Sequence, residues 1–349
     1  MSRFLNERFL NLEAYVPGEQ PQDKKYIKLN TNEMPYPPSS GVVNAVSQTA
    51  DTLNLYPDPT GKALKEKLAE TYGVSPENVF LSNGSDEILS FAFMSFFDKG
   101  VAFADITYGF YKVYAELYGV NAEIIPLKED FSIDPAEYEN ARGGVVIANP
   151  NAPTGRVLSA ESIERIVKSA GGIVIIDEAY ADFGDVSCVK LTEKYDNLII
   201  VRTYSKSRAM AGARLGFAIA NKQVIDDLEK IKFSTNPYNI NRLTLRAGVA
   251  ALEDEEYYKA CISKIRDTRE YVSDELKKLG FDVQPSQANF IFAKSAQMSG
   301  EMLYSKLKNA GILVRHFTGE RIKEYIRITI GTREQMEALI SEVKRIREA

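Results

Sequence analysis

Two short apolar runs, Val145-Val146-Ile147-Ala148 and Ile173-Val174-Ile175-Ile176, indicate the fold class of this chain. Neither run alternates between apolar and polar residues, so each is typical of a strand that is buried on both faces of its sheet. Similar β-branched and apolar runs lie at 79–82, 101–104, 122–127, 198–201 and 216–219. Helical patterns lie between many of them, at 61–72, 85–97, 108–118 and 159–170. This alternation predicts an α/β protein whose large domain has a mostly parallel seven-stranded sheet covered by helices.

The C-terminal part of the sequence has a different pattern. A long charged helical stretch over about 241–278 precedes predicted strands at 290–294, 312–317 and 325–330. A closing helix is expected from Thr332, since Thr332-x-x-Gln335 has the form of a capping box. The first 40 residues are rich in proline and predict an extended arm. We therefore expect an arm over 1–40 that joins the small domain or reaches a partner subunit, a large domain over 41–245, and a small α+β domain over 246–349.

Composition and charge exclude several classes of function. With 26% charged residues and a net charge of −5, the chain has no basic concentration that would predict a nucleic-acid partner. No apolar run approaches the roughly 20 residues of a membrane span, and the N-terminus lacks a signal core, so we expect a cytoplasmic protein. Cys188 and Cys261 have no metal-ligand spacing, and His316 is the single histidine, so we expect no metal site.

Polar segments follow the predicted strands where each one ends, which is where ligands bind in an open α/β sheet. After 79–82 come Asn83, Gly84, Ser85 and Asp86. Gly84 permits a close approach of the backbone, and the helix that Ser85 and Asp86 open offers free N–H groups to an anion. A simple helix cap by Ser85 is the better explanation of this segment when it is taken alone. After 145–148 comes Asn149-Pro150-Asn151-Ala152-Pro153-Thr154-Gly155, a turn restricted by two prolines and a glycine.

Two further strand ends carry an acid and a pair of cations. Asp177 follows 173–176, and a carboxylate at the edge of a core is costly unless it meets a cation. An aspartate that caps the next element is the alternative for Asp177. Lys206 follows the buried strand 198–201 and precedes a stretch rich in Ala and Gly. This setting differs from that of most lysines, which lie on the surface in contact with solvent. Arg214 lies eight residues further along the chain (214 − 206 = 8).

Together these strand ends offer an anion site, a restricted Asn loop, a carboxylate and a lysine. A phosphorylated aromatic cation that carries an aldehyde would use all four, and pyridoxal 5′-phosphate (PLP) is such a molecule. In this hypothesis Lys206 forms the imine, and Asp177 pairs with the protonated pyridine nitrogen. Ser85, Ser205 and Arg214 would hold the phosphate.

Ser205-Lys206 with Arg214 beyond it, and Asp177-x-x-Tyr180 29 residues before the lysine (206 − 177 = 29), resembles the fold-type I PLP-dependent aminotransferases. More narrowly, the chain resembles the histidinol-phosphate aminotransferases. The segments that carry this resemblance are Tyr15-Val16-Pro17-Gly18, Leu29-Asn30-Thr31-Asn32-Glu33, Tyr56-Pro57-Asp58, 82–87, 311–315 and 325–332. The resemblance implies a homodimer that exchanges an amino group between histidinol phosphate and 2-oxoglutarate in histidine biosynthesis.

The resemblance also implies roles for individual residues. Lys206 would carry the cofactor and move the proton, Tyr108 would stack on the pyridine ring, and Tyr180 would bond the ring hydroxyl. Tyr56 would reach the cofactor phosphate of the partner subunit. The residues expected to contact substrate are Tyr15, Asn83, Arg315 and Arg327. Simple packing of the tyrosines and a surface ion pair of Arg327 are the competing explanations.

One position departs from the family pattern. The family has an asparagine directly before Pro-Thr-Gly that bonds the ring hydroxyl, and here that position is Ala152. Either Asn151 or Asn149 takes over this contact, or Tyr180 makes it alone. The cofactor motifs leave open an aromatic or broad-specificity aminotransferase and a PLP decarboxylase that acts on threonine phosphate. A PLP-binding module without enzymatic activity is the third alternative.

Overall fold

The large sheet of the protein has the predicted architecture. The computed structural model describes residues 2–139 and 141–348. Seven strands have the order β2-β8-β7-β6-β5-β3-β4. Their bounds are β2 Val79–Ser82, β3 Val101–Ala104, β4 Ala122–Ile125, β5 Gly144–Ala148, β6 Val174–Asp177, β7 Leu198–Thr203 and β8 Gly216–Ala220. β8 is antiparallel to both of its neighbours, and the remaining pairs are parallel. The predicted mostly parallel seven-stranded sheet is therefore confirmed.

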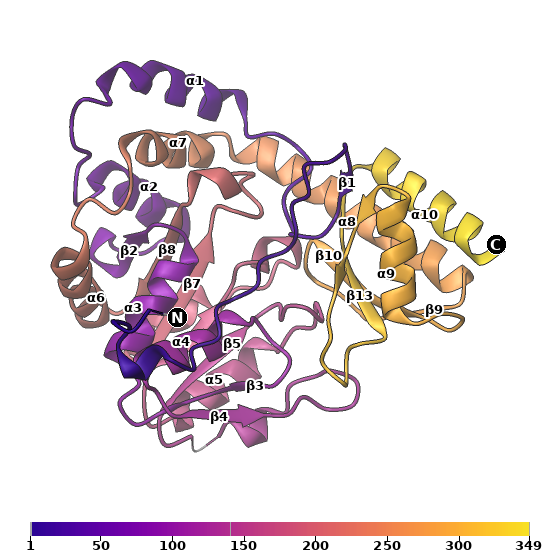
Figure 1. The fold of residues 1–349 in the computed structure, drawn as a ribbon. Coiled ribbons are helices and arrows are strands. Elements are labelled where there is room, and N and C mark those ends of the chain that lie inside the picture. The colour runs from indigo at the N-terminus through magenta and orange to yellow at the C-terminus, as the bar shows by residue number, and fades with distance from the viewer. Residues whose placement is uncertain (1, 140, 349) are drawn as a thin grey trace.

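Helices cover both faces of this sheet (Figure 1). Val146 and Ala148 of β5 pack in a cluster with α3 (Ser85–Ser95), α4 (Phe110–Tyr118) and α6 (Lys222–Thr235). Val145 and Ile147 pack on the other side with α1 (Ser40–Thr49), α2 (Lys62–Tyr72), α5 (Ala160–Ser169) and α7 (Arg242–Glu253). Successive side chains of a strand point to opposite faces. The continuous apolar runs of the sequence thus reflect a sheet with a core on each side.

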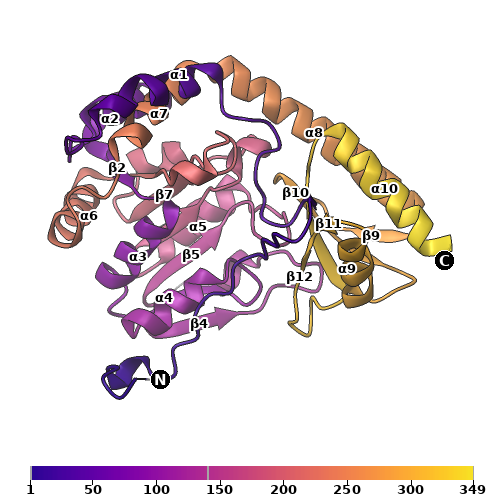
Figure 2. The ribbon, with the colours of Figure 1, turned by 45° about the horizontal axis from the view of Figure 1, so that its top comes forward.

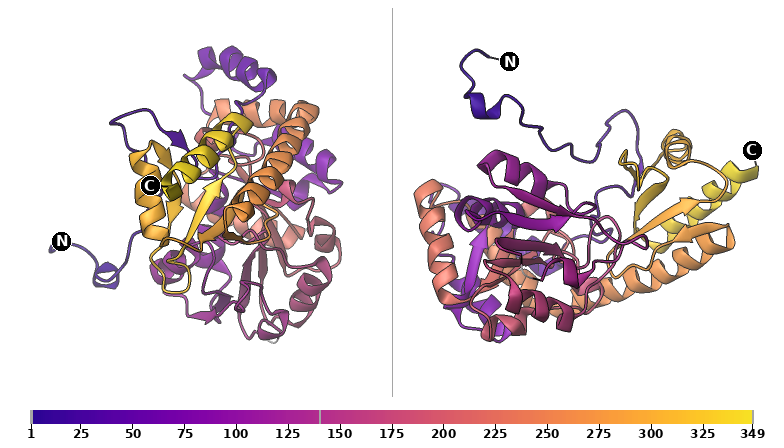
Figure 3. Two further views of the ribbon diagram at one scale, coloured as in Figure 1. Left: turned by 90° about the vertical axis from the view of Figure 1, so that its right-hand side faces the viewer. Right: turned by 90° about the horizontal axis from the view of Figure 1, so that it is seen from below.

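A second, antiparallel sheet forms the smaller body at the other end of the molecule (Figure 2). Its order is β12-β13-β10-β9, with bounds β9 Phe281–Val283, β10 Phe290–Ser295, β12 Arg315–His316 and β13 Tyr325–Thr329. Its hydrophobic core contains residues of α8 (Glu255–Lys278), α9 (Gly300–Asn309) and α10 (Arg333–Glu348). β1 (Ile27–Lys28) of the N-terminal arm pairs in parallel with β11 (Ile312–Leu313). The arm therefore adds a strand beside the small body, while its first residues extend away from the molecule (Figure 3).

Two predicted elements of the C-terminal part are each divided in the structure. The predicted helical stretch 241–278 is helical in the structure, but it is divided into α7 and α8, which meet at Asp254. The Asp254 carboxylate accepts a hydrogen bond from the backbone N–H of Gly41 at 3.2 Å. The strand at 312–317 is two short strands, because β11 pairs with the arm whereas β12 pairs with β13. The capping box before α10 is confirmed by the reciprocal bonds of Thr332 and Gln335, at 2.9 and 3.3 Å.

The division between the two bodies lies near α7 and α8. The boundary expected at 245/246 falls inside α7, which packs against α1 and α2, whereas α8 contacts β9 and β10. The limits of the arm, the large domain and the small domain remain predictions. Over residues 2–139 and 141–348, no helix has the length and apolar character that crossing a membrane requires.

Candidate active site

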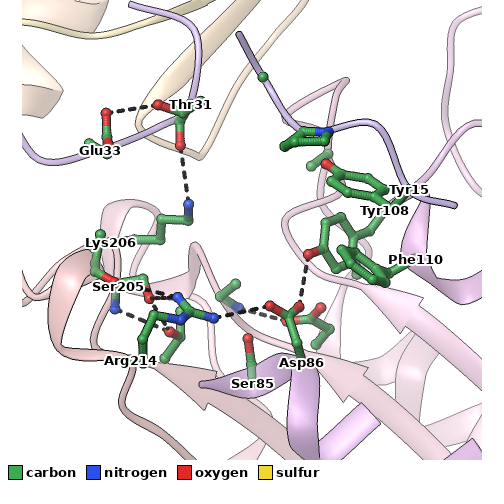
Figure 4. Close-up of a pocket in the computed structure, with 18 of the residues that line it drawn as sticks. Tyr15, Thr31, Glu33, Ser85, Asp86, Tyr108, Phe110, Ser205, Lys206 and Arg214 are labelled. Carbon is green, nitrogen blue, oxygen red and sulfur yellow. Dashed lines mark hydrogen bonds and ion pairs between the residues drawn. The ribbon is translucent and has the colours of Figure 1, made fainter. Parts of the chain in front are cut away.

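A cavity of about 960 Å³ lies at the C-terminal edge of the large sheet. Its walls include the ends of β5, β6 and β7, the start of α3, and parts of the N-terminal arm. The predicted site residues that line it are Tyr15, Ser85, Asp86, Tyr108, Asp177, Tyr180, Ser205, Lys206 and Arg214. The structure thus brings residues from distant parts of the sequence around one hollow (Figure 4).

Lys206 lies on the loop that joins β7 to β8. Its Nζ donates a hydrogen bond to the backbone carbonyl of Thr31 at 3.3 Å (Figure 4). The same atom lies 5.7 Å from the centroid of the Tyr180 ring. The arm residue Thr31 therefore covers the amine from the side of the small body, and sequence reasoning assigned it no role in the site.

Asp177 ends β6 and is buried beneath the cavity. Its carboxylate accepts hydrogen bonds from the Tyr111 hydroxyl at 2.9 Å and from the backbone N–H of Ala179 at 3.1 Å. Both of these donors are neutral, and burial raises the pKa of Asp177 to about 6. A cationic partner reaching this carboxylate would relieve the cost of its burial.

Tyr111 is a functional residue that the sequence did not single out. Its hydroxyl holds Asp177, and its ring is fully buried. Tyr108 comes just before α4, and its ring meets that of Tyr111 edge-on with 5.7 Å between centroids. Nearness in sequence to Tyr108 is therefore the available signal for Tyr111.

A cation, Arg214, lies beside the N-terminus of α3. Gly84 caps this helix with a φ of 79°, and the Arg214 guanidinium reaches the carboxylate of Asp86 at 3.2 Å. A Cβ on Gly84 would lie 2.6 Å from Nη2 of Arg214. Any residue larger than glycine at this position would therefore force the arginine side chain to move. Arg214 itself has a φ of 55°, a left-handed conformation that costs about 1 kcal/mol for a residue with a Cβ. Ser205 accepts a hydrogen bond from Nη1 of Arg214 at 3.5 Å.

Aromatic side chains form the wall opposite Lys206. The Tyr108 hydroxyl donates to Asp86 at 2.8 Å, and burial together with this carboxylate raises the pKa of Tyr108 far above its usual value. Tyr15 stacks on Phe110 with 4.2 Å between ring centroids and meets Tyr108 edge-on at 6.2 Å. Tyr15 thus joins the cavity through aromatic contacts of the arm (Figure 4).

The asparagines of the 149–155 turn point away from the cavity, although Ala152 lines it. The Asn151 amide donates to the Ile106 carbonyl at 2.9 Å, and its oxygen accepts from Thr107 at 2.8 Å. Asn149 bonds both the N–H and the carbonyl of Leu158, at 2.8 and 3.2 Å. The structure therefore corrects the assignment of Asn151 to the cofactor, because its polar atoms tie the turn to the segment before α4, at Ile106 and Thr107.

The two predicted substrate arginines lie on neighbouring strands and are not among the residues that line the cavity, but both are close to arm residues that do. Arg315 of β12 and Arg327 of β13 are register partners. Arg315 donates to the Val16 and Pro17 carbonyls, each at 3.2 Å. Arg327 donates to the Asn30 carbonyl at 3.0 Å, and burial lowers its pKa. Arg327 Nε is buried without a hydrogen-bond partner among the described residues, so this guanidinium has spare capacity for an anion.

Asn83 and Tyr56 lie outside the residues that line the cavity. The Asn83 amide donates to the Asn239 carbonyl at 3.0 Å. Tyr56 is 76% exposed and stacks on Tyr238 with 4.5 Å between ring centroids. The structure of one chain therefore does not bring either residue into the site.

The fold and the site together define a known class of enzyme. Residues 24–343 match the model for aminotransferase class I and II, and the chain belongs to this family. It is 50% identical over 351 residues to the histidinol-phosphate aminotransferase of Brachyspira hyodysenteriae, with 99% of each chain covered.

Two solved structures show the same fold. The histidinol-phosphate aminotransferase from Clostridium acetobutylicum has a TM-score of 0.84 and 27% identity, over 92% of this chain and 98% of that one. The enzyme of that name from Sinorhizobium meliloti, in complex with pyridoxal-5′-phosphate, has a TM-score of 0.85 and 23% identity, over 99% and 100%.

Proposed function

We propose that this chain is a PLP-dependent histidinol-phosphate aminotransferase, with 2-oxoglutarate and glutamate as the second substrate pair. The observation that carries the proposal is the convergence of Lys206, Asp177 and Arg214 on one cavity. The 50% identity to the Brachyspira relative supports the choice of substrate, and the PLP complex of the Sinorhizobium relative supports the choice of cofactor. A role in histidine biosynthesis and a cytoplasmic location are parts of the same proposal.

The residues present fit PLP at both of its ends. Asp177 is a buried carboxylate whose partners are neutral, so a protonated ring nitrogen would supply the missing positive charge. At the other end, Arg214, Ser85 and Ser205 line the cavity beside the N-terminus of α3 and would hold a phosphate.

Asp86 has a supporting role in this arrangement. A carboxylate has no proton to donate to a phosphate, so Asp86 would act by holding Arg214 and Tyr108 in place. Its backbone N–H belongs to the first turn of α3, where N–H groups face an anion.

PLP, when bound, supplies an electron-withdrawing ring that stabilises negative charge on the substrate carbon beside the amino group. Asp177 would keep a proton on the ring nitrogen and so maintain that withdrawal. Nζ of Lys206 would hold the cofactor in the resting enzyme, then remove the proton from the substrate carbon and return it as general acid. Tyr108 would lie against the ring, and Tyr180 would donate to the ring hydroxyl oxygen.

Arg315 and Arg327 would bind the phosphate or carboxylate end of each substrate, with Tyr15 closing the cavity above them. Two charge-assisted hydrogen bonds contribute about 1.5–3 kcal/mol each. The chain would act as a homodimer, in which the exposed Tyr56 of one subunit reaches the cofactor phosphate of the other.

The test is a donor screen of the PLP-loaded protein with 2-oxoglutarate as acceptor. We expect kcat/KM for histidinol phosphate to exceed that for phenylalanine at least tenfold, on the order of 1.4 kcal/mol. A preference for phenylalanine would identify an aromatic or broad-specificity enzyme. Release of carbon dioxide from threonine phosphate without formation of glutamate would identify a decarboxylase. PLP binding without turnover of any amine would leave a binding module.

A further inference from the structure

We propose that Asn32 is a positioning residue that fixes the direction of the Tyr180 hydroxyl, and that Thr329 fixes the orientation of the Asn32 amide. The inference rests on the proposed function, because Tyr180 would donate to the ring hydroxyl oxygen of PLP. It concerns the contact that an asparagine makes in the family and that Ala152 cannot make here.

Asn32 has an unusual backbone and a buried side chain. Its φ is 56°, in the left-handed region that residues other than glycine rarely adopt, and the residue is 1% exposed. Its carbonyl accepts a hydrogen bond from the Asn289 amide at 3.0 Å, and its N–H donates to Oγ1 of Thr329 at 2.9 Å. The small body therefore holds Asn32 in this conformation from two sides.

The hydroxyl of Thr329 determines which way the Asn32 amide faces. Oγ1 of Thr329 accepts from the Asn32 backbone N–H, so its own proton is free to donate to the Asn32 side chain. It does so to Oδ1 at 3.0 Å. With Oδ1 engaged by Thr329, the NH₂ group of Asn32 faces the Tyr180 hydroxyl at 2.9 Å.

Tyr180 consequently accepts a hydrogen bond from Asn32 and keeps its own proton for another partner. A phenol oxygen can accept one hydrogen bond while it donates another. Its ring is held edge-on against Phe290, with 5.0 Å between centroids, and the residue lines the cavity together with Ala152. The side chains of Asn149 and Asn151 are already engaged, with Leu158 and with Ile106 respectively. Tyr180 is therefore the side chain available to donate a hydrogen bond to the ring oxygen, and Asn32 fixes the direction of its hydroxyl.

The test measures the pH midpoint of the visible absorbance of the PLP-loaded protein, together with the dissociation constant of PLP. A donor to the ring oxygen stabilises negative charge there, so its loss lets the chromophore keep a proton to higher pH. We expect Tyr180→Phe to raise the midpoint by about 0.5–1 pH unit, the equivalent of one neutral hydrogen bond. Thr329→Val should raise it in the same direction, because the amide is then free to turn. Thr329→Ser, which keeps the hydroxyl, should restore the wild-type midpoint.

Two further variants separate positioning from a general loss of structure. In Tyr180→Phe/Thr329→Val the midpoint should match that of Tyr180→Phe alone, since the two changes act through one hydroxyl. Asn32→Asp places an acceptor opposite Tyr180, turns the phenol proton away from the cavity, and should also raise the midpoint. A wild-type midpoint in Thr329→Val and Asn32→Asp, or a shift that adds to that of Tyr180→Phe, would overturn the inference. Failure of the wild-type protein to develop a visible band with PLP would instead overturn the proposed function.

Discussion

The guanidinium of Arg214 lies 3.2 Å from the carboxylate of Asp86, directly in front of the glycine that caps α3. This pair joins the β7–β8 loop to the first turn of a helix, so a cation is fixed beside free helix N–H groups, which also favour an anion. We propose this place for the phosphate of the cofactor, and the first prediction tests it.

Arg214→Ala should weaken PLP binding about 10- to 100-fold, because a charge-assisted hydrogen bond contributes about 1.5–3 kcal/mol. Gly84→Ala should weaken it as well, since a Cβ there would lie 2.6 Å from Nη2 of Arg214 and the φ of 79° disfavours alanine. Equilibrium dialysis of the apo protein against PLP measures both constants. Arg345→Ala on α10, which removes an exposed pair with Glu342, is the matched control. Unchanged retention in Arg214→Ala would exclude its assigned role.

Lys206→Ala should abolish turnover, with a loss of about 10⁴-fold or more if general acid–base catalysis and the covalent bond to the cofactor are both removed. After treatment with borohydride, the wild-type protein should carry one cofactor mass and the variant none, as measured by intact-protein mass spectrometry. The control is Lys112→Ala, an exposed lysine beside Glu116. Near-normal activity or labelling of the Lys206 variant would contradict the scheme.

The apo protein should lose stability as the pH rises from about 4 to 6, through the ionisation of Asp177. The pKa of this carboxyl is about 6 in the folded chain and about 3.9 when unfolded, so the folded state binds more protons in this interval. The free energy of unfolding therefore falls with rising pH, by at most about 3 kcal/mol from this group. Asp177→Asn should flatten that slope in urea unfolding and also weaken catalysis in the loaded enzyme. An equally steep slope in the variant would show that other groups cause it.

Arg327→Gln should raise KM for histidinol phosphate and for glutamate about tenfold or more, because both anions would use the same guanidinium. The unpaired Nε of Arg327 and its nearness to Tyr15 motivate this expectation. Steady-state kinetics with each substrate in turn measures the change. An effect on kcat alone, with KM unchanged for both substrates, would argue against anion binding by this residue.

Hybrid dimers test whether Tyr56 acts across an interface. In a mixture of Lys206→Ala and Tyr56→Ala subunits, one site of each hybrid would combine an intact Lys206 with an intact Tyr56 from the other chain. The co-expressed mixture should therefore be more active than Tyr56→Ala homodimers, when the activity of each is divided by the number of sites with an intact Lys206. Equal activity per site would place Tyr56 within its own subunit's site or outside any site.

The sequence predicted the large sheet well, because strands such as 145–148 and 174–177 are apolar on both faces. A polar residue marks the end of each, Asn149 directly after the first and Asp177 as the last residue of the second. The cavity followed from the same logic, since parallel strands bring their C-terminal ends to one edge. It could not predict that Thr31 covers Lys206, because this contact joins residues 175 positions apart and depends on how the arm crosses the small body. The directions of the Asn149 and Asn151 side chains could not be predicted either, because Asn149 bonds Leu158 and Asn151 bonds Ile106, 45 positions away.

The antiparallel pairing of β7 and β8 restricts the length of the loop that joins them. Residues 204–215 leave the sheet beside Thr203 and return to it at Gly216, its register partner, while carrying both Lys206 and Arg214. Insertions are usually tolerated in surface loops, but both ends of this one are held by the sheet. In the proposed site, Lys206 and Arg214 would also have to meet two neighbouring groups of one cofactor, its aldehyde carbon and its phosphate, at a fixed spacing. Homologues and engineered variants should therefore vary widely in the length of other connections and keep this one constant to the residue.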